Sequence, residues 1–374
     1  MKNIKTILIT VLLFVGFFSI SCVKETTTDP NQPLIDQLKL AADSVIKNTP
    51  VPGLVALVVD HKRGINWIYA AGVSNKETNA PMDINQTYRI ASNTKTFTGT
   101  VLLQLVGEGK ISLNDKVTKY FPQYAAASGI TLTMLANMTS GLFDYCDDDS
   151  WFTGCKATPL RIWAPTELAD LSLSHPLLFT PGTQYKYTNT NTILLGMIIE
   201  KVTGNKLATE INNRIVTPLQ LKNTGYMASG TALPGNHGRG YDFGELGITG
   251  DVTESYDVSN SGAAGAVYST PHELQLFVES MVEGGLLPDS LQNRRLNKDF
   301  NQFGPVQSYG LCLSKMGSFY GHNGVIWGYV SSMYHSPDKQ CTVIIYYNLC
   351  RPADHIPDSL FLRFMEILYT KYVF

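Results

Sequence analysis

The most informative segment of the chain is TYRIASNTKTFTGTVLLQLVGE, residues 87–108. Residues 87–91 have the composition of a short strand, and residues 94–108 have the pattern of a mostly apolar helix that is buried on most sides. Between them, Ser92 and Lys95 stand three residues apart, on one face of a helix turn. A serine hydroxyl is a weak nucleophile until a base takes its proton, and the Lys95 amine is placed to do so. The stretch therefore predicts a nucleophilic serine at the start of a buried helix.

The S-x-x-K spacing is weak evidence when taken alone, because it occurs four times in the chain. The three other matches are Ser21/Lys24, Ser44/Lys47 and Ser336/Lys339. The first falls in the N-terminal leader, the second in an amphipathic helix and the third in a turn. Only Ser92 follows a strand pattern and opens an apolar helix, so only this match predicts chemistry.

Two later stretches hold further groups suited to acyl transfer. Tyr187 and Asn189 precede a predicted helix over residues 193–202, and a phenol held near cations loses its proton more easily, which makes Tyr187 a candidate base. Residues 320–325 read YGHNGV and are expected to lie between strands, with paired glycines that allow the close backbone approach of an oxyanion site. Competing matches, YYN at 346–348 and KMG at 315–317, are better explained as a core strand and a segment before a turn.

In this order, the motifs S-x-x-K at Ser92, Y-x-N at Tyr187 and H-x-G at His322 resemble those of the class C β-lactamase and D-alanyl-D-alanine carboxypeptidase group. The resemblance covers nearly everything from residue 34 to the C-terminus. It includes the connecting stretches TLTMLANMTSGL at 131–142, FTPG at 179–182 and GAAGAVYST at 262–270. Three motifs in order, with these stretches between them, are far more specific than any one motif.

The resemblance implies catalytic roles for several motif residues. Ser92 is expected to be the nucleophile, with Lys95 and Tyr187 as the acid/base pair. The backbone N–H groups of Ser92 and Val325 are expected to form the oxyanion hole. These roles describe an enzyme that passes through an acyl-enzyme.

The resemblance also implies substrate-binding positions. Asn189 is expected to donate to the substrate amide, and His322 occupies the basic position where β-lactamases usually carry lysine. Asn323 and Gly324 complete the third motif. Because the family commonly has Thr or Ser at the position of Asn323, recognition of a substrate carboxylate is in doubt.

Strand patterns lie at both ends of the chain, with helical patterns between and beyond them. The strand-like runs are residues 54–60, 65–71, 308–314, 328–334 and 342–347, and the outer helical patterns are 34–47 and 358–372. They predict an α/β (α+β) fold in which one antiparallel sheet is built from both termini and flanked by helices. A mostly helical lobe, roughly residues 111–251, is inserted. The resemblance implies the β-lactamase/transpeptidase-like form of this architecture.

The first 33 residues have the pattern of an export signal and a tether. Lys2 and Lys5 precede an apolar run at 7–18, and small residues lead to Cys22, which resembles the lipidated cysteine of a lipobox. Residues 1–21 are thus a predicted lipoprotein signal peptide, 22–33 a flexible tether and 34–374 the hydrolase domain. The predicted location is lipid-anchored at the cell envelope membrane. An ordinary signal with an incidental cysteine is the alternative, because Ser19 stands where lipoboxes usually carry leucine.

Charge and cysteine content narrow the possible partners. The net charge is −2, and no Lys/Arg cluster interleaves with aromatic residues, so no nucleic acid is expected to bind. Beyond Cys22 there are five cysteines, of which Cys146 and Cys155 are the best candidates for a disulfide; at least one thiol stays free. No Cys or His spacing indicates zinc, and neither metal nor cofactor is expected.

The favoured activity is D-alanyl-D-alanine carboxypeptidase-like cleavage, since His322 replaces lysine. A β-lactamase or a small-ester hydrolase of the same fold is the alternative within the enzymes. A non-catalytic penicillin-recognising lipoprotein is the alternative outside them, although intact Ser92, Lys95 and Tyr187 argue against it. The expected partners are a small peptide, a D-amino-acid-containing substrate or a β-lactam, and a membrane bound through lipid on Cys22.

Overall fold

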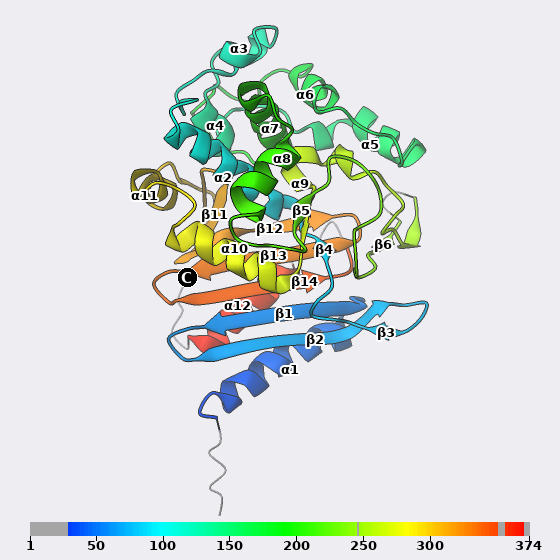
Figure 1. Ribbon diagram of the computed structural model, residues 1–374. Coiled ribbons are helices and arrows are strands. Elements are labelled where there is room, and N and C mark those ends of the chain that lie inside the picture. Colours follow the sequence, from blue (N-terminus) through cyan, green and yellow to red (C-terminus); the bar gives the residue numbers. More distant parts are fainter. Residues whose placement is uncertain (1–28, 245–246, 351–355, 370–374) are drawn as a thin grey trace, which may run out of the picture.

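The central sheet is built from both ends of the chain, as predicted. The structure is a computed structural model that describes residues 29–244, 247–350 and 356–369 (Figure 1), so the predicted signal peptide and Cys22 lie outside the described residues. The nine strands are antiparallel to their neighbours. In spatial order they are β3 (Ala80–Pro81), β2 (Ile65–Asn75), β1 (Gly53–Asp60), β14 (Cys341–Tyr347), β13 (Tyr329–Ser336), β12 (Phe319–Ile326), β11 (Leu313–Met316), β10 (Gln307–Gly310) and β9 (Asn301–Gln302).

The N-terminal and C-terminal strands join where β1 pairs with β14. Leu54 lies opposite Tyr347 and Asp60 opposite Cys341, which closes the sheet across almost 300 residues of sequence. Every residue of both strands is buried, because helices cover both faces of the sheet. This explains why their sequences are continuous apolar runs rather than alternating ones.

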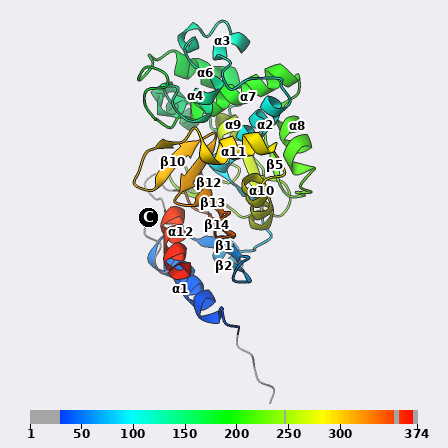
Figure 2. The same ribbon diagram turned by 90° about the vertical axis from the view of Figure 1, so that its left-hand side faces the viewer.

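Helices from distant parts of the chain cover the two faces (Figure 2). The first helix, α1 (Gln32–Asn48), packs beside the last described helix, α12 (Ile356–Leu368), on one face. On the other face, α10 (Pro271–Glu283) packs against β13 and β14. The amphipathic α1 turns Leu38 and Ala42 into the core on its side of the sheet.

A mostly helical part stands above the edge of the sheet in Figure 1. Its helices include α2 (Thr94–Gly107), α3 (Val117–Tyr120), α4 (Leu132–Ala136), α5 (Asp149–Ala157), α6 (Pro165–Leu173), α7 (Asn189–Thr203) and α8 (Leu207–Ile211). The end of the predicted lobe returns to the sheet: in β6 (Tyr241–Phe243), the Tyr241 N–H donates to the Asn348 carbonyl at 3.1 Å.

Shorter elements connect the helical part to the sheet. A small sheet joins β4 (Tyr88–Arg89), β8 (Val267–Ser269) and β5 (Gly225–Tyr226), and β6 pairs with β7 (Thr249–Asp251). The helices α9 (Gly262–Gly265) and α11 (Asp289–Asn297) flank α10 in the sequence. In the sequence, β4 is followed directly by the turn that carries the predicted nucleophile, Ser92.

Two strand predictions were wrong. Residues 308–314 do not form one strand: β10 and β11 are separate, and Cys312, at φ 52°, makes the reversal between them. Residues 320–325 lie within β12 rather than between strands. Their glycines reflect close packing inside the sheet, since a Cβ at Gly321 would lie 1.8 Å from the Met333 carbonyl oxygen.

The predicted disulfide is also absent: Cys146 and Cys155 are free thiols, as are Cys312 and Cys341. The Cys146 sulfur faces the Asn189 amide nitrogen at 3.5 Å, whereas Cys155 is buried in α5. Proximity along the sequence does not bring two sulfur atoms together when each side chain points into a different part of the core.

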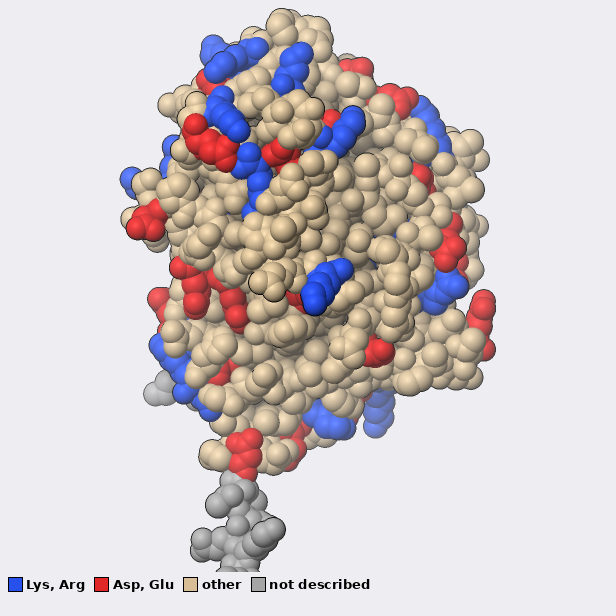
Figure 3. Space-filling view, viewed as in Figure 1, with Lys and Arg blue, Asp and Glu red and all other residues tan. Residues whose placement is uncertain are grey.

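Charge on the surface is mixed. On the face seen in Figure 3, Lys and Arg side chains are interspersed with Asp and Glu. Among the described residues, no helix has both the length and the apolar character needed to cross a membrane.

Candidate active site

The predicted nucleophile lies on a tight turn that feeds a buried helix. Ser92 is the middle residue of the 3-10 turn η1 (Ala91–Asn93), and α2 begins at the second residue after it. The preceding Ala91 has φ 50°, a left-handed conformation that is unfavourable for any residue with a side chain. Such strain is held in place only by surrounding packing and is common at functional sites.

Lys95 is completely buried and aims at Ser92. Its Nζ lies 2.9 Å from the Ser92 Oγ and donates to the Asn189 Oδ1 at 2.8 Å and the Ala264 carbonyl at 3.0 Å. The last two groups only accept, so they fix two of the amine hydrogens. Burial lowers the pKa of the Lys95 amine to about 7, against the opposing effect of the Asp144 carboxylate. In its neutral form, Lys95 therefore points a lone pair at the serine hydroxyl.

Tyr187 lies against the same two groups. Its hydroxyl hydrogen-bonds with Ser92, and the Lys95 Nζ lies 4.9 Å from the centre of its ring. Burial raises the pKa of Tyr187 well above its usual value, although the bond with Ser92 acts in the opposite direction. The expectation that nearby cations make this phenol an easy base is thus not met. The protonated phenol is suited to deliver a proton, and Lys95 is the better base.

Asp144 is a site residue that the sequence did not reveal. Its Oδ2 accepts from the backbone N–H and the side-chain amide of Asn189, both at 3.0 Å, and its Oδ1 accepts from the Cys146 N–H. The Asn189 amide is therefore held between Asp144 and Lys95. Its expected role as a donor to the substrate gives way, in this geometry, to the positioning of Lys95. A lone aspartate in a loop carries no motif, so only folding could show this contact.

His322 is buried and uncharged. Burial, and then the nearby Lys95 charge, lower the pKa of its imidazole to about 3. Its Nδ1 faces the Asn323 carbonyl, which only accepts, so Nδ1 carries the proton and Nε2 accepts from the Tyr309 hydroxyl at 3.1 Å. His322 occupies the predicted position but brings no positive charge to it, and Tyr309 is a second residue that the motifs did not reveal.

The other residues of the third motif shape the cleft floor. A Cβ at Gly324 would lie 2.4 Å from the Ile90 carbonyl oxygen and 2.8 Å from the Ser92 nitrogen, so only glycine lets β12 approach the nucleophile. The Val325 side chain is 44% exposed on the cleft. The Asn323 amide donates to the Asp358 Oδ2 at 2.7 Å, which ties this position to an acidic group of α12.

These residues surround a cavity of about 910 Å³. Its walls are rich in aromatic side chains, and none of the described residues that line it is a lysine or an arginine. Within the described part of the chain, no three His, Cys, Asp or Glu side chains are arranged to hold a metal ion. The groups present are those of nucleophilic and acid–base chemistry.

A profile of the Beta-lactamase family matches residues 42–363. The chain belongs to this family. It resembles the D-stereospecific amidohydrolase of a Streptomyces species at 31% identity and a TM-score of 0.79, covering 89% of this chain and 98% of that one. The chain therefore has the fold of the Beta-lactamase family, and its site presents the nucleophilic serine that a serine hydrolase requires.

Further members of the Beta-lactamase fold are similar. The D-amino acid amidase of Ochrobactrum anthropi SV3, complexed with L-phenylalanine amide, is 25% identical with a TM-score of 0.77, covering 90% of this chain and 99% of that one. A penicillin-binding protein of Bacillus halodurans, 22% identical with a TM-score of 0.74, covers 89% and 98% and shares the fold.

Among curated proteins, Esterase EstB of Burkholderia gladioli is 28% identical over 221 residues, 54% of this chain and 55% of its own length. Protein flp of Staphylococcus aureus (strain MW2) is 30% identical over 203 residues, 53% of this chain and 39% of its own length. The chain thus spans about half the length, or less, of these curated relatives.

Proposed function

We propose that this protein hydrolyses amides or esters through an acyl-enzyme on Ser92. The observation that carries the proposal is the 2.9 Å contact between the Ser92 Oγ and the buried amine of Lys95, whose pKa is about 7. An amine with this pKa is neutral in a large fraction of molecules at physiological pH, which is what a general base requires.

The first half of the reaction transfers the acyl group. The Ser92 Oγ bonds to the acyl carbon as its proton passes to neutral Lys95, and the backbone N–H groups of Ser92 and Val325 stabilise the oxyanion. Tyr187 donates its proton to the leaving group and regains one from Lys95. The leaving alcohol or amine departs, and Ser92 holds the acyl group.

The second half reverses these transfers. Water enters in place of the leaving group and gives its proton to Lys95 through Tyr187 as its oxygen bonds to the acyl carbon. The bond to the Ser92 Oγ breaks, and the serine oxygen recovers the proton from Lys95. The products are a carboxylic acid and the regenerated enzyme.

The charge of the cavity favours a substrate without a free carboxylate near the scissile bond. His322 is neutral, and the described lining contains no lysine or arginine, whereas Asp358 lies at the third motif. An amino-acid amide or a simple ester fits this surface, as the similarity to amidases and an esterase also supports. D-Alanyl-D-alanine carboxypeptidase activity is the second candidate, which the order of the three motifs and the histidine in place of lysine favour at the level of sequence, whereas the neutral state of that histidine does not.

Labelling of the protein with a fluorophosphonate tests the nucleophile. Mass spectrometry should find one adduct on Ser92, and Ser92→Ala should abolish both the adduct and ester hydrolysis. Lys95→Ala should lower the rate by on the order of 10²–10⁴, because it removes the base. For the wild type, kcat/KM should rise with pH through about 7 as Lys95 loses its proton.

Ser44→Ala is the matched control, because the exposed Ser44 has the same four-residue pattern but lies on α1, where its Oγ accepts from the Asn48 amide at 2.9 Å, and it does not line the cavity. Hydrolysis by Ser92→Ala at the wild-type rate would overturn the mechanism. To choose between the candidates, D-Ala-D-Ala peptides are compared with their C-terminal amides: faster cleavage of the amide supports the amidase, and faster cleavage of the free acid supports the carboxypeptidase.

A further inference from the structure

We propose that the cleft binds substrates with a bulky apolar or aromatic group on each side of the scissile bond, in two aromatic subsites on either side of Gly324 along β12. This inference rests on the proposed function and names its substrate class. The substrates proposed here differ from those of an enzyme that releases only ammonia or methanol. In this protein the leaving group is expected to have a binding site of its own.

The strand β12 provides the axis of the cleft. Gly324, the sixth of its eight residues, lies against the Ser92 nitrogen, and His322 and Ile326 stand two residues to either side of it on the same face. At about 3.3 Å per residue, His322 and Ile326 are about 13 Å apart. Groups attached to the two sides of a carbonyl at Ser92 therefore point toward different ends of the strand.

One aromatic wall stands at the His322 end. Tyr309 donates to His322, Tyr185 lies 6.2 Å from Tyr309 between ring centres, and Phe303 stacks on Tyr185 at 5.0 Å with 9° between the planes. All of these residues line the cavity, and the side chain of Phe303 remains 46% exposed.

The other aromatic wall stands at the Ile326 end. Trp327 follows directly, and Trp151 of α5 stacks on it at 5.8 Å with 15° between the planes. Phe152, the next residue of α5, also lines the cavity and is 38% exposed. An exposed large apolar side chain inside a cavity gains most when a ligand removes it from water.

The position of Tyr187 indicates which wall binds the leaving group and which binds the acyl group. Its ring centre lies 5.8 Å from that of Tyr309 and 6.1 Å from that of His322, so it belongs to the first wall. Because Tyr187 is the proton donor to the leaving group, the leaving group is bound at the Phe303 wall. The acyl group is then bound at the Trp151–Trp327 wall.

Four esters test this assignment: the methyl and benzyl esters of acetic acid and of 3-phenylpropanoic acid. Methanol and benzyl alcohol are similar leaving groups in acidity, so a difference between their rates reports binding. The wild type should have a higher kcat/KM for a phenyl group on either side. Phe303→Ala should reduce the benzyl-over-methyl preference by roughly 10-fold, and Phe152→Ala should reduce the phenylpropanoyl-over-acetyl preference by a similar factor.

The rate of deacylation distinguishes the two walls, because the leaving group has already dissociated from the acyl-enzyme when deacylation begins. Phe152→Ala should change the deacylation rate of the phenylpropanoyl-enzyme, and Phe303→Ala should leave it unchanged. Both side chains are exposed, so neither variant should unfold. Leu40→Ala, which removes a 67% exposed side chain on α1, is the control and should alter neither preference.

The outcomes are separable. If Ser92 is labelled by fluorophosphonate but the wild-type rates do not depend on the size of either group, the two subsites are wrong and the proposed function stands. If both variants change the same preference, or if Phe303→Ala changes deacylation, the assignment of the walls is overturned. If Ser92 is not labelled at all, the proposed function fails and this inference fails with it.

Discussion

Burial lowers the pKa of Lys95, and the buried carboxylate of Asp144 opposes this effect. Asp144 holds the Asn189 amide, and that amide holds Lys95, so an anion balances the lysine charge through one intervening side chain. Asp144 also caps the start of its own turn by accepting from the Cys146 N–H, and burial raises the pKa of its carboxyl group. It is a positioning residue, because it acts on Ser92 only through its neighbours.

Asp144→Asn is expected to move the pH dependence of Ser92 labelling to lower pH. Loss of the anion destabilises protonated Lys95, so the pKa of the amine falls below about 7 and the neutral base appears at lower pH. A shift on the order of one pH unit is expected for an opposite charge removed from a buried site. The measurement is the rate of fluorophosphonate labelling against pH.

Asp147→Asn is the matched control, since it removes the same charge from an exposed position three residues away. It should leave the pH midpoint nearly unchanged because solvent screens it. Asp144→Ser keeps a capping oxygen without the charge and replaces Asp144→Asn if that variant does not fold. A midpoint equal to that of the wild type in a folded Asp144 variant would refute the role of Asp144.

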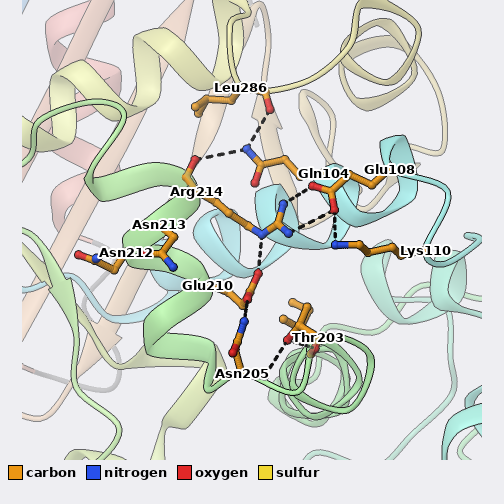
Figure 4. Close-up of polar contacts among 11 residues, drawn as sticks. Gln104, Glu108, Lys110, Thr203, Asn205, Glu210, Asn212, Asn213, Arg214 and Leu286 are labelled. Carbon is orange, nitrogen blue, oxygen red and sulfur yellow. Dashed lines mark hydrogen bonds and ion pairs between the residues drawn. The ribbon is translucent and has the colours of Figure 1, made fainter.

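One arginine links three helical elements away from the nucleophile (Figure 4). Arg214, in the π-helical turn η4 (Asn212–Val216), forms ion pairs with Glu210 of α8 and with Glu108 at the end of α2. Gln104 of α2 donates to the Leu286 and Arg214 carbonyls at 3.0 and 3.4 Å. The network joins α2, which carries Lys95, to the helices beside it.

Arg214→Ala is expected to lower the free energy of unfolding by about 1 kcal/mol, the upper end for ion pairs near the surface. The hydrogen bond with Arg214 lowers the pKa of Glu108 to about 2, so the pair stabilises the fold above the pKa of an unfolded glutamate. That contribution is lost as the pH falls toward 2. Chemical denaturation at pH 7 and pH 3, with and without salt, measures both effects.

Lys206→Ala serves as the comparison, because its pair with Glu200 is long, at 3.6 Å, and exposed. It should change the unfolding free energy much less than Arg214→Ala. Equal stabilities of the Arg214→Ala and wild-type proteins would show that the network does not stabilise the fold.

The protein as a whole combines a sheet closed by its two chain ends with a cleft formed where the helical part meets β12. The predicted lipid anchor precedes α1 in the sequence and stays a prediction, because Cys22 lies outside the described residues. Cys22→Ser should move the protein from the membrane to the soluble fraction and leave Ser92 labelling unchanged. Membrane association that survives this substitution would remove the lipoprotein hypothesis.

The family, the pairing of strands from both chain ends and the motif positions of Ser92, Lys95 and Tyr187 could all be predicted from the sequence. These features depend on local spacing and on apolar runs, which survive in a linear sequence. The prediction of a single strand at 308–314 failed because an apolar run does not show a two-residue reversal. Residues 320–325 were expected between strands and lie within β12, because their glycines serve a close approach between backbones rather than a turn.

The charge of the site and the shape of its walls could be seen only in the folded protein. Asp144 and Phe303 lie in loops, Tyr309 in strand β10 and Trp151 in helix α5, and no spacing rule connects them to the motifs. The neutral His322 and the lowered pKa of Lys95 likewise follow from burial, which depends on the packing of the whole chain. Motifs identify the reacting residues. Desolvation and contacts between distant segments determine the protonation of these residues and the substrates that fit the cleft.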